Sequence, residues 1–337
     1  YEKSTLRRLI KVSEGIAKDC YLQNDELENV LSSAEHGVFD LIQTRNTRDY
    51  KPISEVVMDA LRRIEEAAKS EGNLTGLSTG FKDLDDKTTG LQPSDFVLIA
   101  ARPSMGKTAF ALNIAQHVAF KLNQPVAIFS LEMSEDLLVN RLLSMEARVD
   151  AQNLRTGNLN ENEWGSIMES AETIGKSNLI IDTTSGISIS QLRTKARKYK
   201  LDKDIQLIII DYLQLMSGSG KNDNRQSELS EISRGLKSMA RELNIPVIAL
   251  SQLSRKVEDR SDKRPMMSDI RESGAIEQDA DIIMFIYRED YYDKETDKIN
   301  VAEINIAKQR NGPIGPVYLT WQPKYTKFVN STKEQRN

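Results

Sequence analysis

The chain has 337 residues, of which 46 are Lys or Arg and 50 are Asp or Glu, so its formal net charge is −4. This length predicts one large domain with an appendage, or two domains. The charge balance excludes a generally basic coat, so any contact with nucleic acid must come from local loops. No apolar run approaches the ~20 residues of a membrane span, which excludes an integral membrane protein. A single cysteine, Cys20, excludes an intrachain disulfide framework and most structural zinc sites, and it predicts a cytoplasmic protein.

Two segments near the N-terminus, residues 6–20 and 27–42, carry apolar residues at helical spacing. Asn24 and Asp25 lie between them and can end one helix and cap the next. We therefore predict a helical hairpin over residues 1–45.

A polar stretch with Pro52 follows and predicts a linker at residues 43–53. Directly after it, Ser54 can N-cap a helix with a narrow apolar stripe. Two interpretations stay open: the helix lies on its own domain, or it docks on a neighbouring subunit. The stripe consists of Val57, Leu61, Ile64 and Ala68.

From Thr75 onward, short apolar strands alternate with amphipathic helices. Continuous Val, Ile and Leu runs are typical of strands buried on both faces, so we predict an α/β domain over 75–330 with a mostly parallel sheet. Residues 299–308 and 314–321 alternate more and predict a terminal hairpin, followed by a frayed tail at 331–337. The predicted buried strands are 96–101, 125–131, 178–182, 205–211, 245–250 and 281–287.

The strongest functional signal is a phosphate-binding loop, ARPSMGKT, between an apolar strand and a helix. Backbone N–H groups and the positive helix end can cradle phosphates there. Lys107 would reach the β- and γ-phosphates of a nucleotide, and the Thr108 hydroxyl would hold Mg²⁺. Ala101 departs from the general pattern, which has Gly at that position. The candidate nucleotide-binding residues are Ala101, Arg102, Pro103, Ser104, Met105, Gly106, Lys107 and Thr108.

Three polar residues follow other predicted strands, where the ligands of parallel sheets bind. Asp211 would support Mg²⁺, Glu132 would orient or deprotonate the attacking water, and Gln252 would sense the γ-phosphate. Since one crossover helix separates Glu132 from Lys107, its strand is expected to neighbour the loop strand. The alternatives are a turn Asp, a helix N-terminal Glu and a polar cap.

Two further kinds of segment are candidates for contacts with charged ligands. Lys308 and Arg310 form a basic tip before a turn at a predicted sheet edge, where arginine can stabilise phosphoryl charge. The loops at 217–226 and 268–279 combine glycines with a few basic residues, a composition that suits nucleic-acid phosphates. A solvated turn and ordinary surface loops are the alternatives.

These motifs in this order resemble the DnaB-type replicative DNA helicases of bacteria and their phages. The segments that carry the resemblance are ARPSMGKTAFALNIA, FSLEMS, LIIIDYLQLM, PVIALSQLSR, KRPMMSDIRESGAIEQDADI and AKQRNGP. The family tolerates Ala at the position of Ala101.

The resemblance implies a RecA-like ATPase that uses ATP and Mg²⁺ and forms a homohexameric ring moving 5′→3′ on single-stranded DNA. Residues 1–45 look like the remnant of an N-terminal collar domain that meets a DnaG-type primase, and 46–74 like the family's linker with its docking helix. A helicase loader is a further implied partner.

The site roles that the resemblance implies agree with those above and add others. Glu132 matches the catalytic base and Gln252 the γ-phosphate sensor. Lys308 and Arg310 match basic residues supplied to the neighbour's ATP, and Arg141 a contact to the nucleotide base. The loop that follows the DNA backbone would include Arg271, Glu272 and Gly274.

Two other functions share parts of this pattern. A RecA-like recombinase or recombination mediator would share the ATP machinery but form filaments. An ATP-dependent scaffold that recruits primase would not translocate. The helical hairpin and linker helix before Thr75 favour the helicase.

Overall fold

The computed structural model describes residues 2–22, 30, 33–34, 37–38, 52–69, 74–216, 225–270 and 274–331. The chain divides into two compact units. One is Tyr1–Lys69 with Ser190–Lys195, and the other is Ser70–Ile189 with Ala196–Asn337. Within the described ranges, no helix is both long and apolar enough to cross a membrane.

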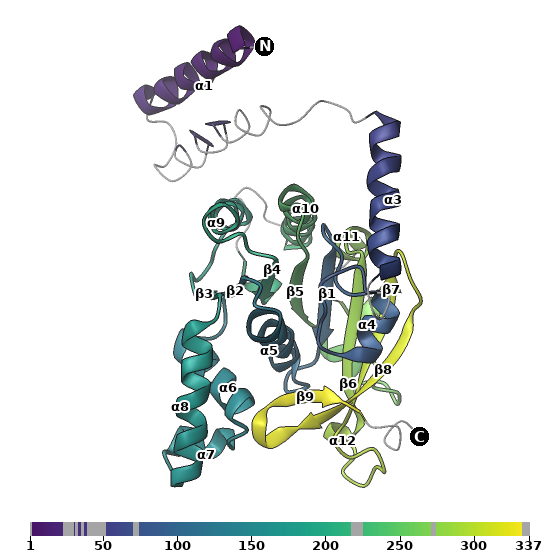
Figure 1. Cartoon of the computed structure of the whole chain (residues 1–337). Helices are drawn as coiled ribbons and strands as arrows, with labels where there is room; N and C mark the ends of the chain where they lie inside the picture. Colours follow the sequence, from purple (N-terminus) through teal and green to yellow (C-terminus); the bar gives the residue numbers. More distant parts are fainter. Residues whose placement is uncertain are drawn as a thin grey trace. The chain divides into compact units, whose positions relative to one another are not determined.

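The first unit contributes two long helices, α1 (Glu2–Leu22) and α3 (Ile53–Lys69) (Figure 1). Helix α1 confirms the first predicted helix, whereas most of the second, 27–42, lies outside the described residues. The N-cap assigned to Ser54 is wrong, because Ser54 lies inside α3. The carbonyl of Pro52 accepts the amide of Glu55 at 3.0 Å and so starts the helix earlier.

One sheet dominates the second unit, and in the described part of the chain it has nine strands in the order β3-β2-β4-β5-β1-β6-β7-β8-β9. The six strands from β3 to β6 in this order pair in parallel, which confirms the predicted fold class. The remaining three are antiparallel. The strands are β1 (Phe96–Ala101), β2 (Val126–Ser130), β3 (Leu179–Asp182), β4 (Leu207–Asp211), β5 (Val247–Gln252), β6 (Ile282–Arg288), β7 (Val301–Gln309), β8 (Gly315–Gln322) and β9 (Lys327–Asn330).

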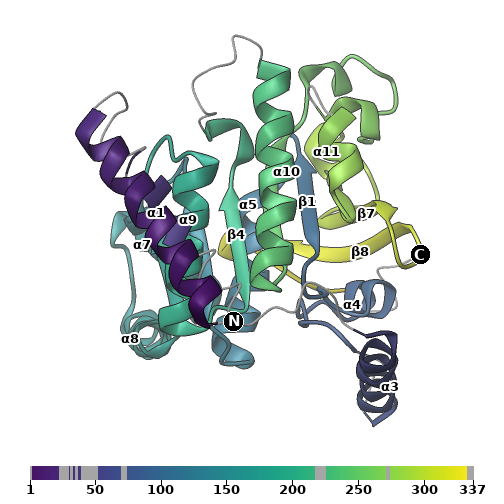
Figure 2. The same cartoon turned by 90° about the horizontal axis from the view of Figure 1, so that it is seen from above.

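Helices cover both faces of the parallel strands (Figure 2). Helix α5 lies on one face, and α10 and α11 lie on the other. A helical insertion formed by α6, α7 and α8 connects β2 to β3. The helices that lie wholly or partly in this unit are α4 (Lys82–Thr88), α5 (Lys107–Gln116), α6 (Glu135–Ala147), α7 (Ala151–Thr156), α8 (Glu161–Lys176), α9 (Ile189–Lys203), α10 (Arg225–Leu243), α11 (Gly274–Asp279) and α12 (Glu289–Tyr292).

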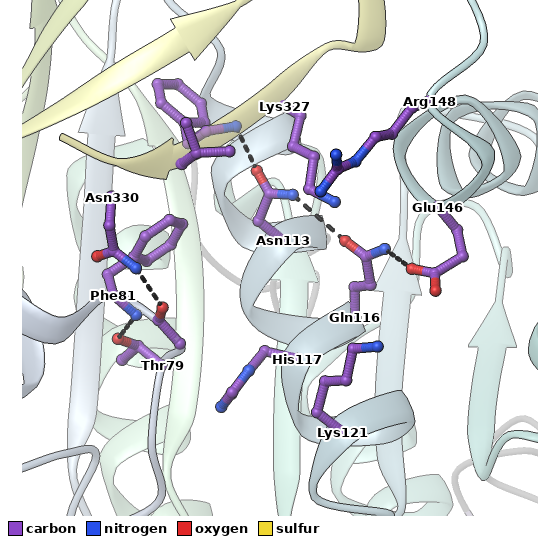
Figure 3. A pocket seen from close by; sticks show the side chains of 13 residues that line it. Thr79, Phe81, Asn113, Gln116, His117, Lys121, Glu146, Arg148, Lys327 and Asn330 are labelled. Atoms are coloured by element: carbon purple, nitrogen blue, oxygen red, sulfur yellow. Dashed lines mark hydrogen bonds between the residues drawn. The ribbon is translucent and has the colours of Figure 1, made fainter. Parts of the chain in front are cut away.

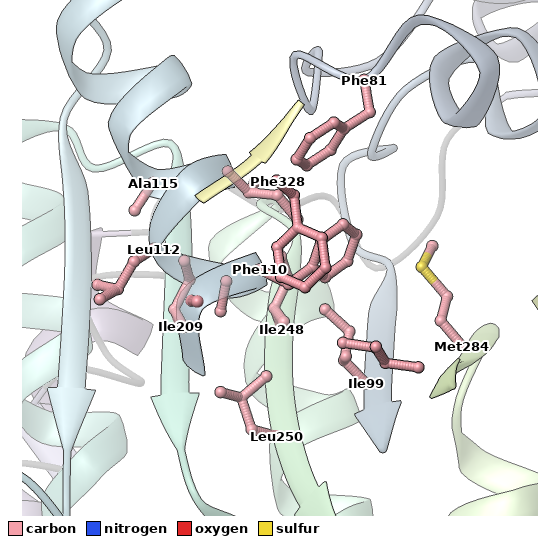
Figure 4. Close-up of a cluster of buried hydrophobic side chains, with 14 of the residues drawn as sticks. Phe81, Ile99, Phe110, Leu112, Ala115, Ile209, Ile248, Leu250, Met284 and Phe328 are labelled. Carbon is pink, nitrogen blue, oxygen red and sulfur yellow. The ribbon is translucent and has the colours of Figure 1, made fainter. Parts of the chain in front are cut away.

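The core on the α5 face is built from alternate strand residues, as the period of two in a strand requires. Ile99, Ile209 and Ile248 point to this face and meet Phe110 of α5 (Figure 4). Phe110 in turn stacks on Phe81 with ring centroids 5.1 Å apart. The strands are buried on both faces, which is why their sequences read as continuous apolar runs.

The C-terminal part extends the sheet further than the sequence predicted. Strands β7 and β8 confirm the predicted hairpin, but β9 was not predicted, because its sequence KFVN holds only two apolar residues and so lacks an apolar run. Phe328 of β9 is buried against Phe110, with centroids 5.6 Å apart. This last strand therefore completes the core that supports α5.

Candidate nucleotide site

The predicted phosphate-binding loop connects β1 to α5, as the sequence indicated. Ser104 and Gly106 have positive φ angles of 67° and 94°, which turn the chain sharply between the strand and the helix. At Gly106, a Cβ atom would lie 2.7 Å from the Phe328 ring, so the position needs glycine on two grounds. The loop thus presents the N-terminus of α5 at the carboxyl edge of the sheet, where phosphates bind.

Asp211 ends β4 and lies against the first residues of α5. The Thr108 hydroxyl donates a 2.6 Å hydrogen bond to Asp211 Oδ2, and Lys107 Nζ lies 3.6 Å from Asp211 Oδ1. Lys107 also lies over the Tyr212 ring, 4.5 Å from its centroid. Residues that are 103 positions apart in the chain therefore form one polar cluster beneath the loop. Sequence reasoning missed Tyr212, although it directly follows the strand-end aspartate.

The electrostatics of this cluster extend to Glu132 and Arg141. Burial lowers the pKa of Lys107, while Asp211 and Glu132 act in the opposite direction. Burial also lowers the pKa of Arg141, whereas the same two carboxylates raise it. Both cations thus lie within electrostatic range of both acids, and their charge is available to neutralise phosphates. The proposed contact of Arg141 to a nucleotide base stays a prediction.

The expected pairing of the strands before Glu132 and Lys107 is wrong. Strand β2, which leads to Glu132, pairs with β3 and β4, so β4 and β5 lie between it and β1. The two residues still interact electrostatically, because Lys107 lies 3.6 Å from Asp211 at the end of β4. Asp211 in turn pairs in register with Ser130, at the end of β2 just before Glu132.

Gln252 is the last residue of β5 and pairs in register with Ala101, at the base of the loop. The Gln214 side chain holds this strand end: its Nε2 donates to Ser251 Oγ at 2.8 Å and to the Gln252 carbonyl at 3.2 Å. The structure therefore places Gln252 beside the phosphate loop. Gln214, which sequence reasoning missed, lies in a one-turn helix after β4.

The side chain of Arg102 is buried and bonded within the same chain. Its Nε donates to Glu258 at 2.9 Å, and its Nη1 donates to the Leu253 carbonyl at 2.9 Å. The Leu253 amide returns a 3.1 Å hydrogen bond to Ala101. These contacts indicate that Arg102 fixes the loop to the segment after β5.

The residues present fit a magnesium ion held together with a nucleotide. Asp211 Oδ1 is buried, and among the described residues it has no hydrogen-bond partner. A buried carboxylate oxygen of this kind suits Mg²⁺, which prefers oxygen ligands. The described ranges contain no group of three His, Cys, Asp or Glu side chains that could hold a metal. Besides Asp211 and the Thr108 hydroxyl, the ligands of such an ion would be nucleotide phosphates and water.

Lys308 and Arg310 lie at the opposite end of the strands from this loop. Gln309 pairs with Ile282, and Ile282 pairs with Val97 near the start of β1. At ~3.3 Å per residue, the start of β1 is about 15 Å from its end. The expectation of a sheet edge is wrong, because β7 lies between β6 and β8. What separates these residues from their own loop is the length of β1.

The candidate DNA-binding residues are only partly described. Arg271 and Glu272 lie outside the described residues, as do residues 217–224 of the other loop. Gly274 is exposed and begins α11.

A hollow of about 300 Å³ opens at the other end of α5 and contains none of the loop residues (Figure 3). Lys327 extends over it and donates to the Met145 carbonyl at 3.0 Å. Burial lowers the pKa of Lys327. The positive charges of Arg148 and Lys121 lower it as well, whereas the negative charge of Glu146 raises it. The hollow therefore lies apart from the candidate phosphate loop.

Comparison with known proteins assigns the chain to a family. Residues 76–330 match the family described as DnaB-like helicase C terminal domain. The chain is similar to the replicative DNA helicase DnaC of Bacillus subtilis (strain 168), with 55% identity over 98% of this chain and 73% of that protein. It belongs to the DnaB-like replicative helicases.

Other relatives are also similar to most of the chain. The replicative DNA helicase DnaB of Geobacillus stearothermophilus is 52% identical over 98% of this chain and 73% of that protein. A solved structure of an isolated ATPase domain aligns with a TM-score of 0.80 and 44% identity, covering 84% of this chain and all of that one. A DnaB-like replicative helicase studied for its interactions with primase aligns with a TM-score of 0.84 and 39% identity, covering 98% of this chain and 77% of that one.

Proposed function

We propose that this chain forms a homohexameric ring that couples ATP hydrolysis to 5′→3′ movement on single-stranded DNA and to duplex unwinding. The observation that carries the proposal is the separation of Arg310 from Lys107 by the length of β1. An arginine that serves a phosphate site but cannot reach the one in its own subunit must serve a neighbour's. Hydrolysis would then require assembly, as in a ring motor.

Each of the described residues has its own role at the proposed ATP site. Lys107 and the amides at the start of α5 bind the β- and γ-phosphates, and Glu132 takes the proton of the attacking water. Thr108 and Asp211 would hold Mg²⁺, which neutralises phosphate charge when it is bound. Arg310 of the adjacent subunit would neutralise the charge that develops on the γ-phosphoryl group, a contribution of ~10³–10⁵ in rate. Gln252 at the end of β5 would report the loss of that group to the DNA-binding loops.

The N-terminal helices would assemble the ring and bind partners. Helix α3 exposes the apolar side chains of its stripe, with Val57 at 48%, Leu61 at 49% and Ile64 at 64% exposure. We propose that this stripe docks on a neighbouring subunit, the second of the two interpretations that the sequence leaves open. We propose that residues 1–45 belong to a collar that meets primase, and that a helicase loader opens the ring.

Mixed rings test the assignment of Arg310. Lys107→Ala and Arg310→Ala subunits should each be inactive alone, because each breaks every site in a uniform ring. When they are mixed, some interfaces pair an intact loop with an intact Arg310, so DNA-stimulated ATPase should partly return. If activity stays absent at every ratio while mixed rings are shown to form, Arg310 does not act on the neighbour. Unwinding of a forked duplex by the wild type separates a helicase from a filament-forming recombinase or a scaffold.

DNA binding should be independent of sequence and weaken with salt, because the proposed contacts reach only phosphates. Arg271→Ala should weaken binding to every single-stranded sequence alike, measured by fluorescence anisotropy. A loss confined to some sequences would contradict backbone recognition.

A further inference from the structure

Asp281, which precedes β6, is the centre of a charged cluster at the amino end of the parallel strands. Its carboxylate accepts the Phe96 amide at 2.8 Å and lies 2.5 Å from Lys237 Nζ of α10. Its side chain is 8% exposed. Lys237 Nζ also donates to the Ser94 carbonyl at 2.9 Å. A buried carboxylate held by both a strand amide and a lysine keeps one position.

Arg310 is attached to Asp281 by its own ion pair. Arg310 Nε lies 3.3 Å from Asp281 Oδ1, and one Nη donates to the Gln278 carbonyl at 2.6 Å. The backbone of Arg310 is held at the same place, because its amide donates to the Asp281 carbonyl at 3.0 Å. These contacts engage two of the three guanidinium nitrogens, so the third can still bind a phosphoryl oxygen. The side chain is 49% exposed, which leaves it accessible to another subunit.

Lys308 is engaged differently. Its Nζ donates to the carbonyls of Glu277 at 2.5 Å and Ala280 at 2.6 Å, at the end of α11. Burial lowers the pKa of Lys308, and so does Arg310. The ammonium therefore caps the end of α11, and of the two basic residues Arg310 is the one oriented by a carboxylate.

We propose that Asp281 is a positioning residue, which holds the Arg310 guanidinium in the orientation from which it reaches the ATP of the neighbouring subunit. The inference rests on the proposed role of Arg310. Asp281 would thereby contribute to an ATP site whose phosphate loop belongs to the neighbouring subunit. Without the ion pair, Arg310 would keep its charge but sample several rotamers, and a misplacement of about 1 Å can cost ~100-fold in rate.

Asp281→Asn tests the positioning role, because the amide keeps the shape and the acceptor for Phe96 but removes the charge that orients Arg310. We expect kcat of the DNA-stimulated ATPase to fall about 10- to 100-fold. KM for ATP should change less than about twofold, since the phosphate loop is intact. Asp279→Asn is the matched control: it removes the same charge two residues earlier, where the carboxylate accepts from Ser233 at 2.8 Å, and should stay near the wild type. Unchanged or raised kcat in Asp281→Asn would overturn the proposal.

Asp281→Glu adds a second variant that retains the charge. It should keep more of kcat than Asp281→Asn does, and equal losses would mean that the charge does not matter.

Mixing separates positioning from a structural defect. Asp281→Asn subunits have an intact loop, and Lys107→Ala subunits have an intact Arg310, so mixed rings should recover ATPase. A failure to recover, in rings shown to be mixed, would overturn the proposal. The same mixture with Arg310→Ala is run in parallel: recovery there without recovery for Asp281→Asn rejects the role of Asp281 alone, whereas failure with Arg310→Ala rejects the role of Arg310 itself.

Discussion

Replacing Gly106 by alanine should be unusually costly, because two separate penalties meet at this one residue of the phosphate loop. Its φ of 94° lies where an L-residue is strained, at a cost of about 1–2 kcal/mol. The added Cβ would lie 2.7 Å from Phe328 Cζ and 3.0 Å from Phe328 Cε2, and such overpacking typically costs about 1–3 kcal/mol. Together these penalties amount to about 2–5 kcal/mol, and the smaller freedom of the unfolded chain offsets about 0.4–1 kcal/mol, so Gly106→Ala should lower the free energy of unfolding by about 1–5 kcal/mol.

Gly157 provides a control in which only the first penalty applies. Its φ is 73°, but a Cβ there would have no atom within 4 Å. Alanine also reduces the freedom of the unfolded chain, which offsets about 0.4–1 kcal/mol, so Gly157→Ala should lose only about 0–1.6 kcal/mol. The difference between the two variants measures the clash with Phe328.

Urea unfolding followed by circular dichroism, at one protein concentration and without nucleotide, measures both variants. Gly106→Ala should cost less in a Phe328→Leu background than in the wild type, because a smaller side chain relieves the contact. Equal losses for Gly106→Ala and Gly157→Ala would refute the reasoning, since the ring of Phe328 would then not confine the loop.

Three further outcomes follow from single residues. Burial and the neighbouring Asp281 raise the pKa of Asp95 to about 6 in the folded state, above its unfolded value. The native state therefore loses stability as the pH rises from about 4 to 6. Asp95→Asn should thus stabilise the protein by about 1–2 kcal/mol at pH 7, after a discount for partial exposure, and the gain should vanish below pH 4 in urea titrations at both pH values. Gly165→Ala, inside α8 with no atom within 4 Å of the new Cβ, should raise the free energy of unfolding by about 0.5–1 kcal/mol, and a loss would contradict an open helix surface. Thr108→Val removes the hydroxyl that donates to Asp211 at 2.6 Å and should raise the Mg²⁺ concentration needed for half-maximal ATPase at least tenfold, whereas an unchanged magnesium dependence would exclude Thr108 from the metal site.

Local chemistry made much of this protein predictable from its sequence. A strand buried on both faces must be apolar throughout, so β1, β4 and β5 were visible as continuous runs. The phosphate loop was equally visible, since the positive φ angles, the lysine and the hydroxyl must follow one another in the chain to form it. The carboxyl ends of parallel strands meet at one edge of a sheet, which is why Asp211 could be placed near Lys107.

Tertiary structure decided what depends on pairing between distant segments. Strand order is set by which crossover helix packs where, and no local pattern encodes it, so β2 was expected beside β1 although two strands separate them. Strand β9 lacks an apolar run, yet its Phe328 confines Gly106 from the far end of the domain sequence. Asp281 gave no signal of its own, because an aspartate before a strand usually serves a turn. Its partners Phe96, Lys237 and Arg310 come from three other elements, and only the folded sheet brings their charges and amides within hydrogen-bonding distance.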